Sequence, residues 1–413
     1  MKKAILTLIT ITLLLLGCTK KSPTSSSFSE DSVRGERLKT KTLTTYSAPL
    51  IQQLINLAGY EIPFDLEQSV KIVSITYVTL DGLGDKVKAS GALMIPQELD
   101  DMPLLSLQHG TVFKREEVAS VSPLNSIEGM AGTLIASLGY VVCVPDYVGF
   151  GVSEEMHPYI HAKSLAVSVI DFMRAAQDYC DAKDIILNDQ IFLAGYSEGG
   201  YATMATHKEI EENYAGEFIL TAVAPMAGPY DLETDMQNIF QTADYAELNY
   251  LAFIFTAWDH IYQWNNLDYV FYEPYASKMP NLYDGSKGSG EIARELPNDF
   301  NQLFRADFIQ SVRDGNETDM LAVARENTLL DWAPIAPVRL YHGTADQIVP
   351  YHHATTALAN LNNAGGTVEL VTIQGGGHVS SALPAFLDVV DWLEGFREPA
   401  VAKSLIADQS FTH

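Results

Sequence analysis

The stretch Ile191-Phe-Leu-Ala-Gly-Tyr-Ser-Glu-Gly-Gly200 decides the fold of this 413-residue chain. Its first four residues form an apolar run that is typical of a buried strand, and the next five fit the pattern G-x-S-x-G. Between a strand and a helix, this pattern forms a tight turn that exposes the serine hydroxyl, and the glycines avoid side-chain clashes at that turn. The preceding strand and the following helical segment therefore predict that Ser197 is a nucleophile.

Around this stretch, short apolar runs alternate with segments of helical period. The alternation predicts βαβ units and a mainly parallel sheet with helices on both faces, in which ligands bind at the carboxyl ends of the strands. The apolar runs are 104–107, 140–144, 190–194, 218–224, 338–341 and 368–373, and the helical segments include 164–179, 199–210 and 383–393. Before them, 71–80 and 87–95 are predicted to form an antiparallel strand pair.

One interval, 231–332, interrupts this alternation. It holds no comparable buried strand, but it contains helical and aromatic stretches such as Tyr250-Leu-Ala-Phe-Ile-Phe-Thr-Ala-Trp258. A segment of this length is not structureless inside a domain, so we predict a helical cap inserted after the sixth predicted strand of a core formed by 38–230 and 333–400. Aromatic residues in such a segment more often belong to the hydrophobic core than line a ligand site, but some of these would suit an apolar acyl chain.

A serine nucleophile needs a base and an acid, and the sequence offers one candidate for each role. His378 ends Gly375-Gly-Gly-His378 directly after the last apolar run, and Asp346 follows the run 338–341 in a loop. A base must accept the serine proton, and the acid fixes the tautomer of the base. The order Ser197, Asp346, His378 and their places after strand ends predict a catalytic triad.

The oxyanion of an acyl-transfer intermediate needs backbone donors near the nucleophile. The N–H of Glu198, the residue after Ser197, is the expected first donor. Thr111, in Leu107-Gln-His-Gly-Thr111, follows a predicted strand and is the candidate for the second, although this segment also fits a plain tight turn.

The N-terminus has the pattern of an export signal. Two lysines precede an apolar run from Ala4 to Leu16, which is too short to span a bilayer, so 1–17 is predicted to be a signal peptide. Leu15-Leu-Gly-Cys18 resembles the lipobox of bacterial lipoproteins, which implies acylation of Cys18 and a polar tether over 18–37. The alternative is an ordinary cleaved signal with a chance cysteine. The expected location is extracytoplasmic, lipid-anchored to the bacterial cell envelope.

Composition narrows the functional classes further. A hydrophobic content of 47% supports a large core, and a formal net charge of −26 disfavours nucleic-acid binding. No phosphate loop or dinucleotide fingerprint occurs, so no cofactor is expected. His352 and His353 are neighbours that would not face one another on a helix, and no metal is assigned. Cys143 and Cys180 are too few for a disulfide scaffold, and their pairing is left open.

The chain resembles the α/β-hydrolase superfamily, and within it the secretory lipases of the lipase A type. The resemblance spans about 104–392 and rests on Gly195 to Gly200, Val144-Pro-Asp-Tyr-Val-Gly-Phe-Gly151, Asp346-Gln-Ile-Val-Pro350 and Gly377-His378. It implies the α/β-hydrolase fold with a helical cap, and it implies that Asp146 joins Glu198 in the oxyanion hole. Asp146 would alternatively cap its loop. Glu198 departs from the small residue often found after the serine, and its carboxylate would lie near the site and alter substrate preference.

The expected function is hydrolysis of carboxylic esters, including lipids, through an acyl-enzyme. Two alternatives stay open from the residues alone. A serine peptidase of the same fold would use the same triad, and a non-catalytic lipoprotein would keep the fold as a binding module. The acyl and alcohol specificity and the oligomeric state are not predicted.

Overall fold

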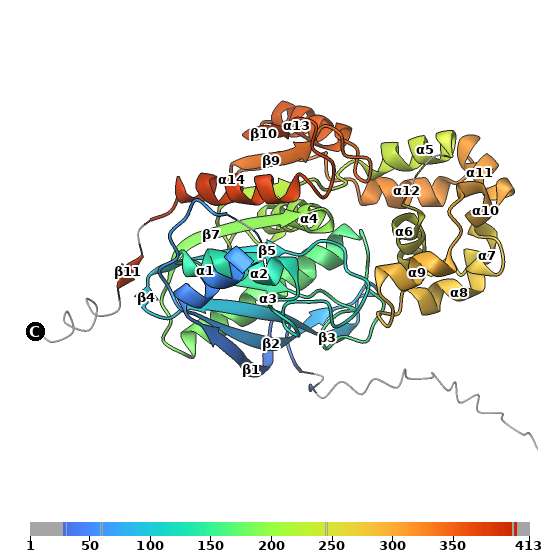
Figure 1. Cartoon of the computed structure of the whole chain (residues 1–413). Helices are drawn as coiled ribbons and strands as arrows, with labels where there is room; N and C mark the ends of the chain where they lie inside the picture. Colours follow the sequence, from blue (N-terminus) through green and yellow to red (C-terminus); the bar gives the residue numbers. More distant parts are fainter. Residues whose placement is uncertain are drawn as a thin grey trace, which may run out of the picture.

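The computed structural model describes residues 28–402 except 30, 58, 60, 244, 246 and 399 (Figure 1). The predicted signal peptide, the predicted lipidation site Cys18 and most of the predicted tether lie outside the described residues. The tether is predicted too long at its C-terminal end. Ser32 is buried, and Arg34 Nε lies 3.0 Å from Asp171 Oδ2, so the chain already packs on the folded body before position 37.

A nine-stranded sheet forms the centre of the molecule, in the order β1-β2-β3-β6-β5-β7-β8-β9-β10. It is antiparallel from β1 to β6 and parallel from β6 to β10, which confirms the predicted mainly parallel sheet. The predicted antiparallel pair of 71–80 and 87–95 is formed by β2 and β3. The strands are β1 (Arg37–Tyr46), β2 (Val70–Leu80), β3 (Lys86–Pro96), β5 (Met102–Gln108), β6 (Val141–Pro145), β7 (Leu187–Tyr196), β8 (Leu220–Met226), β9 (Val338–Gly343) and β10 (Val368–Ile373). A separate two-stranded sheet pairs β4 (Leu99–Asp100) with β11 (Val401–Ala402).

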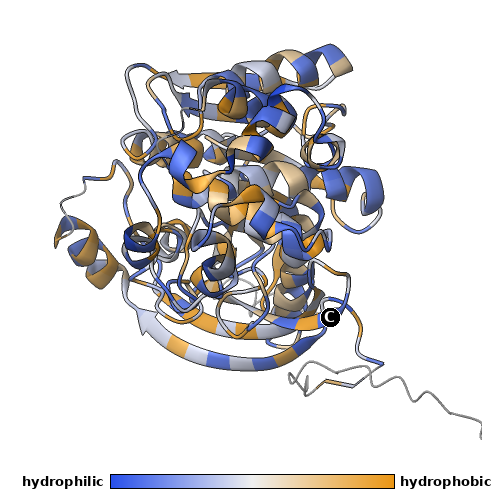
Figure 2. Ribbon diagram, turned by 90° about the vertical axis from the view of Figure 1, so that its right-hand side faces the viewer, coloured by the Kyte–Doolittle hydropathy of each residue, from blue (hydrophilic) through white to orange (hydrophobic). Residues whose placement is uncertain are grey.

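Helices cover both faces of the sheet because successive side chains of its central strands point to opposite sides. In β7, Ile191 and Leu193 join one hydrophobic cluster, and Phe192 and Ala194 join the other. The first face is covered by α3 (Ala162–Asp181), α4 (Glu198–Asn213) and α13 (His352–Ala364). The second face is covered by α1 (Ala48–Leu57), α2 (Ile127–Ser137) and α14 (Ala382–Glu394). The curved strands in the lower part of Figure 2 show hydrophobic and hydrophilic residues in turn along their length.

Between β8 and β9 the chain forms a group of helices beside the carboxyl edge of the sheet, at the right of Figure 1. These are α5 (Leu232–Thr242), α6 (Leu248–Ile261), α7 (Leu267–Val270), α8 (Tyr275–Leu282), α9 (Ser289–Glu295), α10 (Phe300–Leu303), α11 (Ala306–Arg313) and α12 (Thr318–Glu326). Phe240 on α5 meets Phe300, Phe304 and Phe308 edge-to-face, with ring centroids 5.2–5.4 Å apart. This aromatic packing is continuous with the core of the sheet. Within the described ranges, no helix has the length and apolar character to span a membrane.

Candidate active site

Ser197 occupies a sharp turn between β7 and α4. Its backbone has φ 61° and ψ −123°. Residues other than glycine rarely adopt this conformation, and the proteins that contain it often have it at a functional site. The turn is possible because Gly195 and Gly199, two residues to either side of Ser197, lack side chains. A Cβ added at Gly199 would lie 2.2 Å from the carbonyl oxygen of Gln108, and one added at Gly195 would lie 2.3 Å from the carbonyl oxygen of Gly199. The turn therefore directs the Ser197 hydroxyl toward the carboxyl edge of the sheet.

His378 comes from the loop after β10 and faces the serine. Its Nε2 lies 2.8 Å from Ser197 Oγ, and its Nδ1 lies 2.6 Å from Asp346 Oδ2. The hydroxyl of Tyr196 donates to the His378 carbonyl at 2.5 Å, which ties the loop to the end of β7. A carboxylate accepts only, so Nδ1 carries the proton and Nε2 is free to accept the proton of the serine.

Asp346 lies in the loop after β9 and is held by backbone donors. Its Oδ1 accepts the N–H groups of Ile348 at 3.0 Å and Val349 at 2.9 Å. Burial alone would raise the pKa of the Asp346 carboxyl, but hydrogen bonds from His342, His378 and the Val349 amide outweigh it and hold that pKa well below its ordinary value. Asp346 is therefore an anion at neutral pH and favours the Nδ1–H tautomer of His378.

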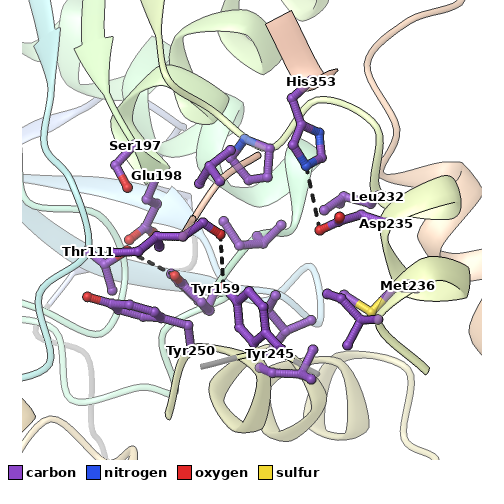
Figure 3. A pocket seen from close by; sticks show the side chains of 17 residues that line it. Thr111, Tyr159, Ser197, Glu198, Leu232, Asp235, Met236, Tyr245, Tyr250 and His353 are labelled. Atoms are coloured by element: carbon purple, nitrogen blue, oxygen red, sulfur yellow. Dashed lines mark hydrogen bonds and ion pairs between the residues drawn. The ribbon is translucent and has the colours of Figure 1, made fainter. Parts of the chain in front are cut away.

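Two of the three predicted oxyanion residues lie beside the serine. Thr111 and Glu198 line the same pocket as Ser197, as Figure 3 shows. The Glu198 N–H is at the first position of α4, where backbone donors have no partner within the helix. The preceding amide, that of Gly110, donates to Glu128 Oε1 at 2.9 Å, so Gly110 is not free to act as a donor to an oxyanion.

The expectation that Asp146 contributes to the oxyanion hole is wrong. Its N–H donates to the Ser90 carbonyl at 2.9 Å, continuing the pairing of β3 with β6. Its buried carboxylate accepts from Ser90 Oγ at 2.6 Å and from the hydroxyl of Ser120, away from Ser197. Asp146 thus fixes the loop that leaves β6, which is the alternative that the sequence left open.

The pocket beside Ser197 has a largely apolar wall that the helical interval supplies. Its empty volume, which includes the open space at its mouth, is about 550 Å³. Leu232, Met236 and Ile239 recur on one face of α5, and this spacing was the signal in the sequence that would have identified them. The other aliphatic lining residues are Ile160, Pro229, Leu251, Ile254, Ile348 and Val349. Tyr159 and Tyr250 add hydroxyls near the serine end, where Tyr159 pairs with Thr111 Oγ1 at 2.9 Å.

A buried pair next to Ser197 was not predicted. His157 Nε2 lies 2.6 Å from Glu198 Oε1, and both side chains are almost completely buried. The Glu198 carboxylate was expected near the site, and it lies there, but its histidine partner is 41 positions away in the loop before α3. A contact of this kind depends on how that loop folds and leaves no pattern in the sequence.

Asp235, His352 and His353 bring three metal-ligand atoms within 4.8 Å of one another at the far side of the pocket. The two imidazole rings stack at 4.4 Å, contrary to the expectation that these neighbours would diverge. However, His353 Nδ1 accepts the Asp231 N–H at 3.1 Å, so the proton of that ring is on Nε2. Because the nitrogen that carries the proton is the one that faces Asp235 Oδ2, at 3.5 Å, this ring is poorly prepared to bind a cation.

Cys143 and Cys180 are both buried free thiols, which settles the pairing that the sequence left open. Burial raises the pKa of each thiol, so neither is poised to react.

Comparisons with known proteins give a family and several similar structures. The family model described as secretory lipase matches residues 126–397, more than half of the chain. A rice cell wall degrading esterase, LipA from Xanthomonas oryzae, is 29% identical with a TM-score of 0.81, over 88% of this chain and 100% of that one. A putative hydrolase from Legionella pneumophila is 27% identical with a TM-score of 0.81, over 88% and 99%. Candida antarctica lipase A in its closed state shares the fold, at 14% identity and a TM-score of 0.66 over 90% and 85%. A search of curated proteins found no match.

Proposed function

Since the chain belongs to the secretory lipase family, and is thus an ester hydrolase with the α/β-hydrolase fold, we propose that Ser197, His378 and Asp346 carry out the hydrolysis. The observation that carries this proposal is the unbroken hydrogen-bond chain from Ser197 Oγ to His378 Nε2 and from His378 Nδ1 to Asp346 Oδ2. Such a chain turns a weak nucleophile into one that a base can activate.

The proposed reaction has two half-reactions. His378 Nε2 accepts the hydroxyl proton while Ser197 Oγ bonds to the ester carbonyl carbon, and Asp346 stabilises the resulting imidazolium. The tetrahedral oxyanion accepts hydrogen bonds from the N–H groups of Glu198 and Thr111. The alcohol leaves with the proton from His378. A water molecule then gives a proton to His378 and attacks the acyl carbon, which releases the acid and restores the Ser197 hydroxyl.

We further propose that the helical interval, residues 231–332, is a cap that binds the acyl chain. The apolar side chains of α5 and α6 that line the pocket support this role, because an acyl chain gains about 0.8 kcal/mol for each methylene removed from water. The triad alone would also suit a serine peptidase, but membership of the lipase family and the apolar pocket favour an ester with an apolar acyl group.

The test of the nucleophile is Ser197→Ala, assayed on p-nitrophenyl butyrate. We expect kcat to fall by about 10⁴-fold or more, since the residual rate would come only from the oxyanion donors and substrate binding. Ser286→Ala, at an exposed position of the interval, is the matched control. Retained turnover in Ser197→Ala would refute the triad. A fluorophosphonate probe should label the wild type and not the variant, which also separates an enzyme from a non-catalytic binding protein.

Membership of the secretory lipase family indicates a location outside the cytoplasm. We propose in addition that Cys18 is acylated and anchors the enzyme to the bacterial cell envelope, on the basis of the lipobox resemblance around Leu15 to Cys18. Expression of Cys18→Ala should move the protein from the membrane fraction to the soluble fraction. Unchanged partition into detergent would contradict the anchor and leave the triad unaffected.

A further inference from the structure

The carboxylate of Glu198 occupies an unusual position for catalysis. Glu198 directly follows the nucleophile, is 1% exposed, and supplies the proposed oxyanion donor through its backbone. A negative side chain so close to a developing oxyanion would raise the energy of that oxyanion, because like charges in a buried site repel strongly. The positive end of the α4 helix dipole does not remove this repulsion, because it stabilises the carboxylate as well as the oxyanion.

The hydrogen bonds of His157 determine where the protons of the pair lie. His157 Nδ1 is 2.8 Å from the Val148 carbonyl, which only accepts, so Nδ1 carries a proton. His157 Nε2 and Glu198 Oε1 are 2.6 Å apart, so one further proton lies between them. Whether that proton is assigned to the ring or to the carboxyl, the two side chains together are neutral.

The groups around Glu198 leave this shared proton as the main compensation for the negative charge of its carboxylate. The titratable groups that face Glu198 are Glu128 on α2, Tyr147 and Tyr159 in the loop after β6, and Tyr250 on α6. None of these is a cation. Glu198 Oε2 has no hydrogen-bond partner among the described residues.

The nearby His109 does not supply a proton to Glu198. Its two ring nitrogens lie 2.7 Å from the Gly110 carbonyl and 3.0 Å from the Asp146 carbonyl, so both nitrogens face partners other than Glu198.

His157 is also fixed rigidly in this position. Its ring packs against Phe150 at 4.5 Å and stacks on Tyr147 at 5.9 Å. From the helical interval, Phe253 approaches the ring at 5.8 Å. A Cβ at Gly149 would lie 2.7 Å from the Cα of His157, so the backbone there is in close contact as well.

We propose that His157 is a positioning residue for the ester hydrolysis. By sharing a proton with Glu198, it keeps the His157–Glu198 pair without net charge, so that the backbone amide of Glu198 can stabilise the oxyanion. The inference rests on the proposed function. It predicts that loss of the shared proton raises the free energy of the transition state more than that of the bound ground state, because only the transition state carries the oxyanion.

The test compares His157→Gln, Glu198→Gln and the double variant on p-nitrophenyl butyrate. In His157→Gln the amide can still donate a hydrogen bond to Glu198, but it supplies no titratable proton. We expect kcat to fall on the order of 10- to 100-fold, with little change in KM. Adding Glu198→Gln to His157→Gln removes the charge and should recover most of the loss. Glu198→Gln alone should lose clearly less than His157→Gln.

Rescue by the second substitution separates this role from a purely structural one. If His157 only packed its loop, Glu198→Gln would not restore the kcat of His157→Gln, and KM would change together with kcat. Thermal unfolding and fluorophosphonate labelling identify variants that have lost their fold.

Two results would overturn the proposal in folded protein: a kcat of His157→Gln equal to that of the wild type, or a double variant no better than His157→Gln. Each of them would leave the triad standing as long as Ser197→Ala is inactive. Activity in Ser197→Ala would instead refute the proposed function itself.

Discussion

Asp346 Oδ2 lies 2.6 Å from His378 Nδ1, and this contact sets the direction in which the imidazole can move a proton. In Asp346→Asn the side-chain NH₂ would donate to Nδ1, which places the ring proton on Nε2, where it faces Ser197. We therefore expect kcat for p-nitrophenyl butyrate to fall on the order of 10³- to 10⁴-fold while the fold is kept. Asp388→Asn, at an exposed acid on α14, is the control. A loss below about 10-fold would contradict the assigned role of Asp346.

The turn at Ser197 depends on the absence of a side chain at Gly199. A Cβ there would lie 2.2 Å from the Gln108 carbonyl oxygen, so either β5 or α4 must shift. We expect Gly199→Ala to destabilise the protein by about 3 kcal/mol or more and to lower Tm by several degrees. Gly216→Ala is the matched control, because no atom lies within 4 Å of its added Cβ. Similar Tm values for the two variants would mean that the turn tolerates a side chain.

More of the candidate catalytic residues than of their surroundings could be predicted from the sequence. Ser197, Asp346 and His378 are linked to strand ends by short motifs, and a parallel sheet brings its strand ends to one edge. The central strands were found for a similar reason, since burial on both faces requires continuous apolar runs. By contrast, β1 has the sequence Arg-Leu-Lys-Thr-Lys-Thr-Leu-Thr-Thr-Tyr and lies at the sheet edge, where polar residues are tolerated. Its polar composition concealed the strand.

Loop contacts account for the parts that could not be predicted. The segment around Asp146 was matched to a family motif, but a motif gives the place of a residue and not the direction of its N–H group. That direction follows from the pairing of β3 with β6, in which the Asp146 amide is already used. The pairing of His157 with Glu198 likewise arises only when the loop after β6 is folded.

Acid should weaken the fold through His161. Burial, together with the charge of Lys163, lowers the pKa of this histidine to about 4, from an ordinary value of 6.5. Above pH 6.5 the ring is neutral in both the folded and the unfolded protein and contributes nothing. As the pH falls from 6.5 to 4, the unfolded chain binds a proton that the folded protein does not, so stability is lost over this window.

This loss is on the order of 2 kcal/mol between pH 7.5 and pH 5. His161→Gln should therefore reduce the decrease in the free energy of unfolding between these two pH values, measured by urea denaturation. His260→Gln, at an exposed position, should leave the decrease as it is in the wild type. An equal decrease in the wild type and in His161→Gln would assign the acid sensitivity to other groups.

The pocket wall should set the acyl-chain preference. Ile254 on α6 is 9% exposed and lines the pocket, so Ile254→Trp would fill space that a long acyl chain needs. Losing contact with two buried methylenes costs about 1.6 kcal/mol, and we expect kcat/KM for p-nitrophenyl octanoate to fall roughly 10-fold. The acetate ester, which does not extend as far, should change less than about 3-fold. Ile335→Trp, at a position that is 79% exposed, is the control for the added bulk. If Ile254→Trp lowered both esters equally, the acyl chain would bind elsewhere, because a blocked chain site must discriminate by length.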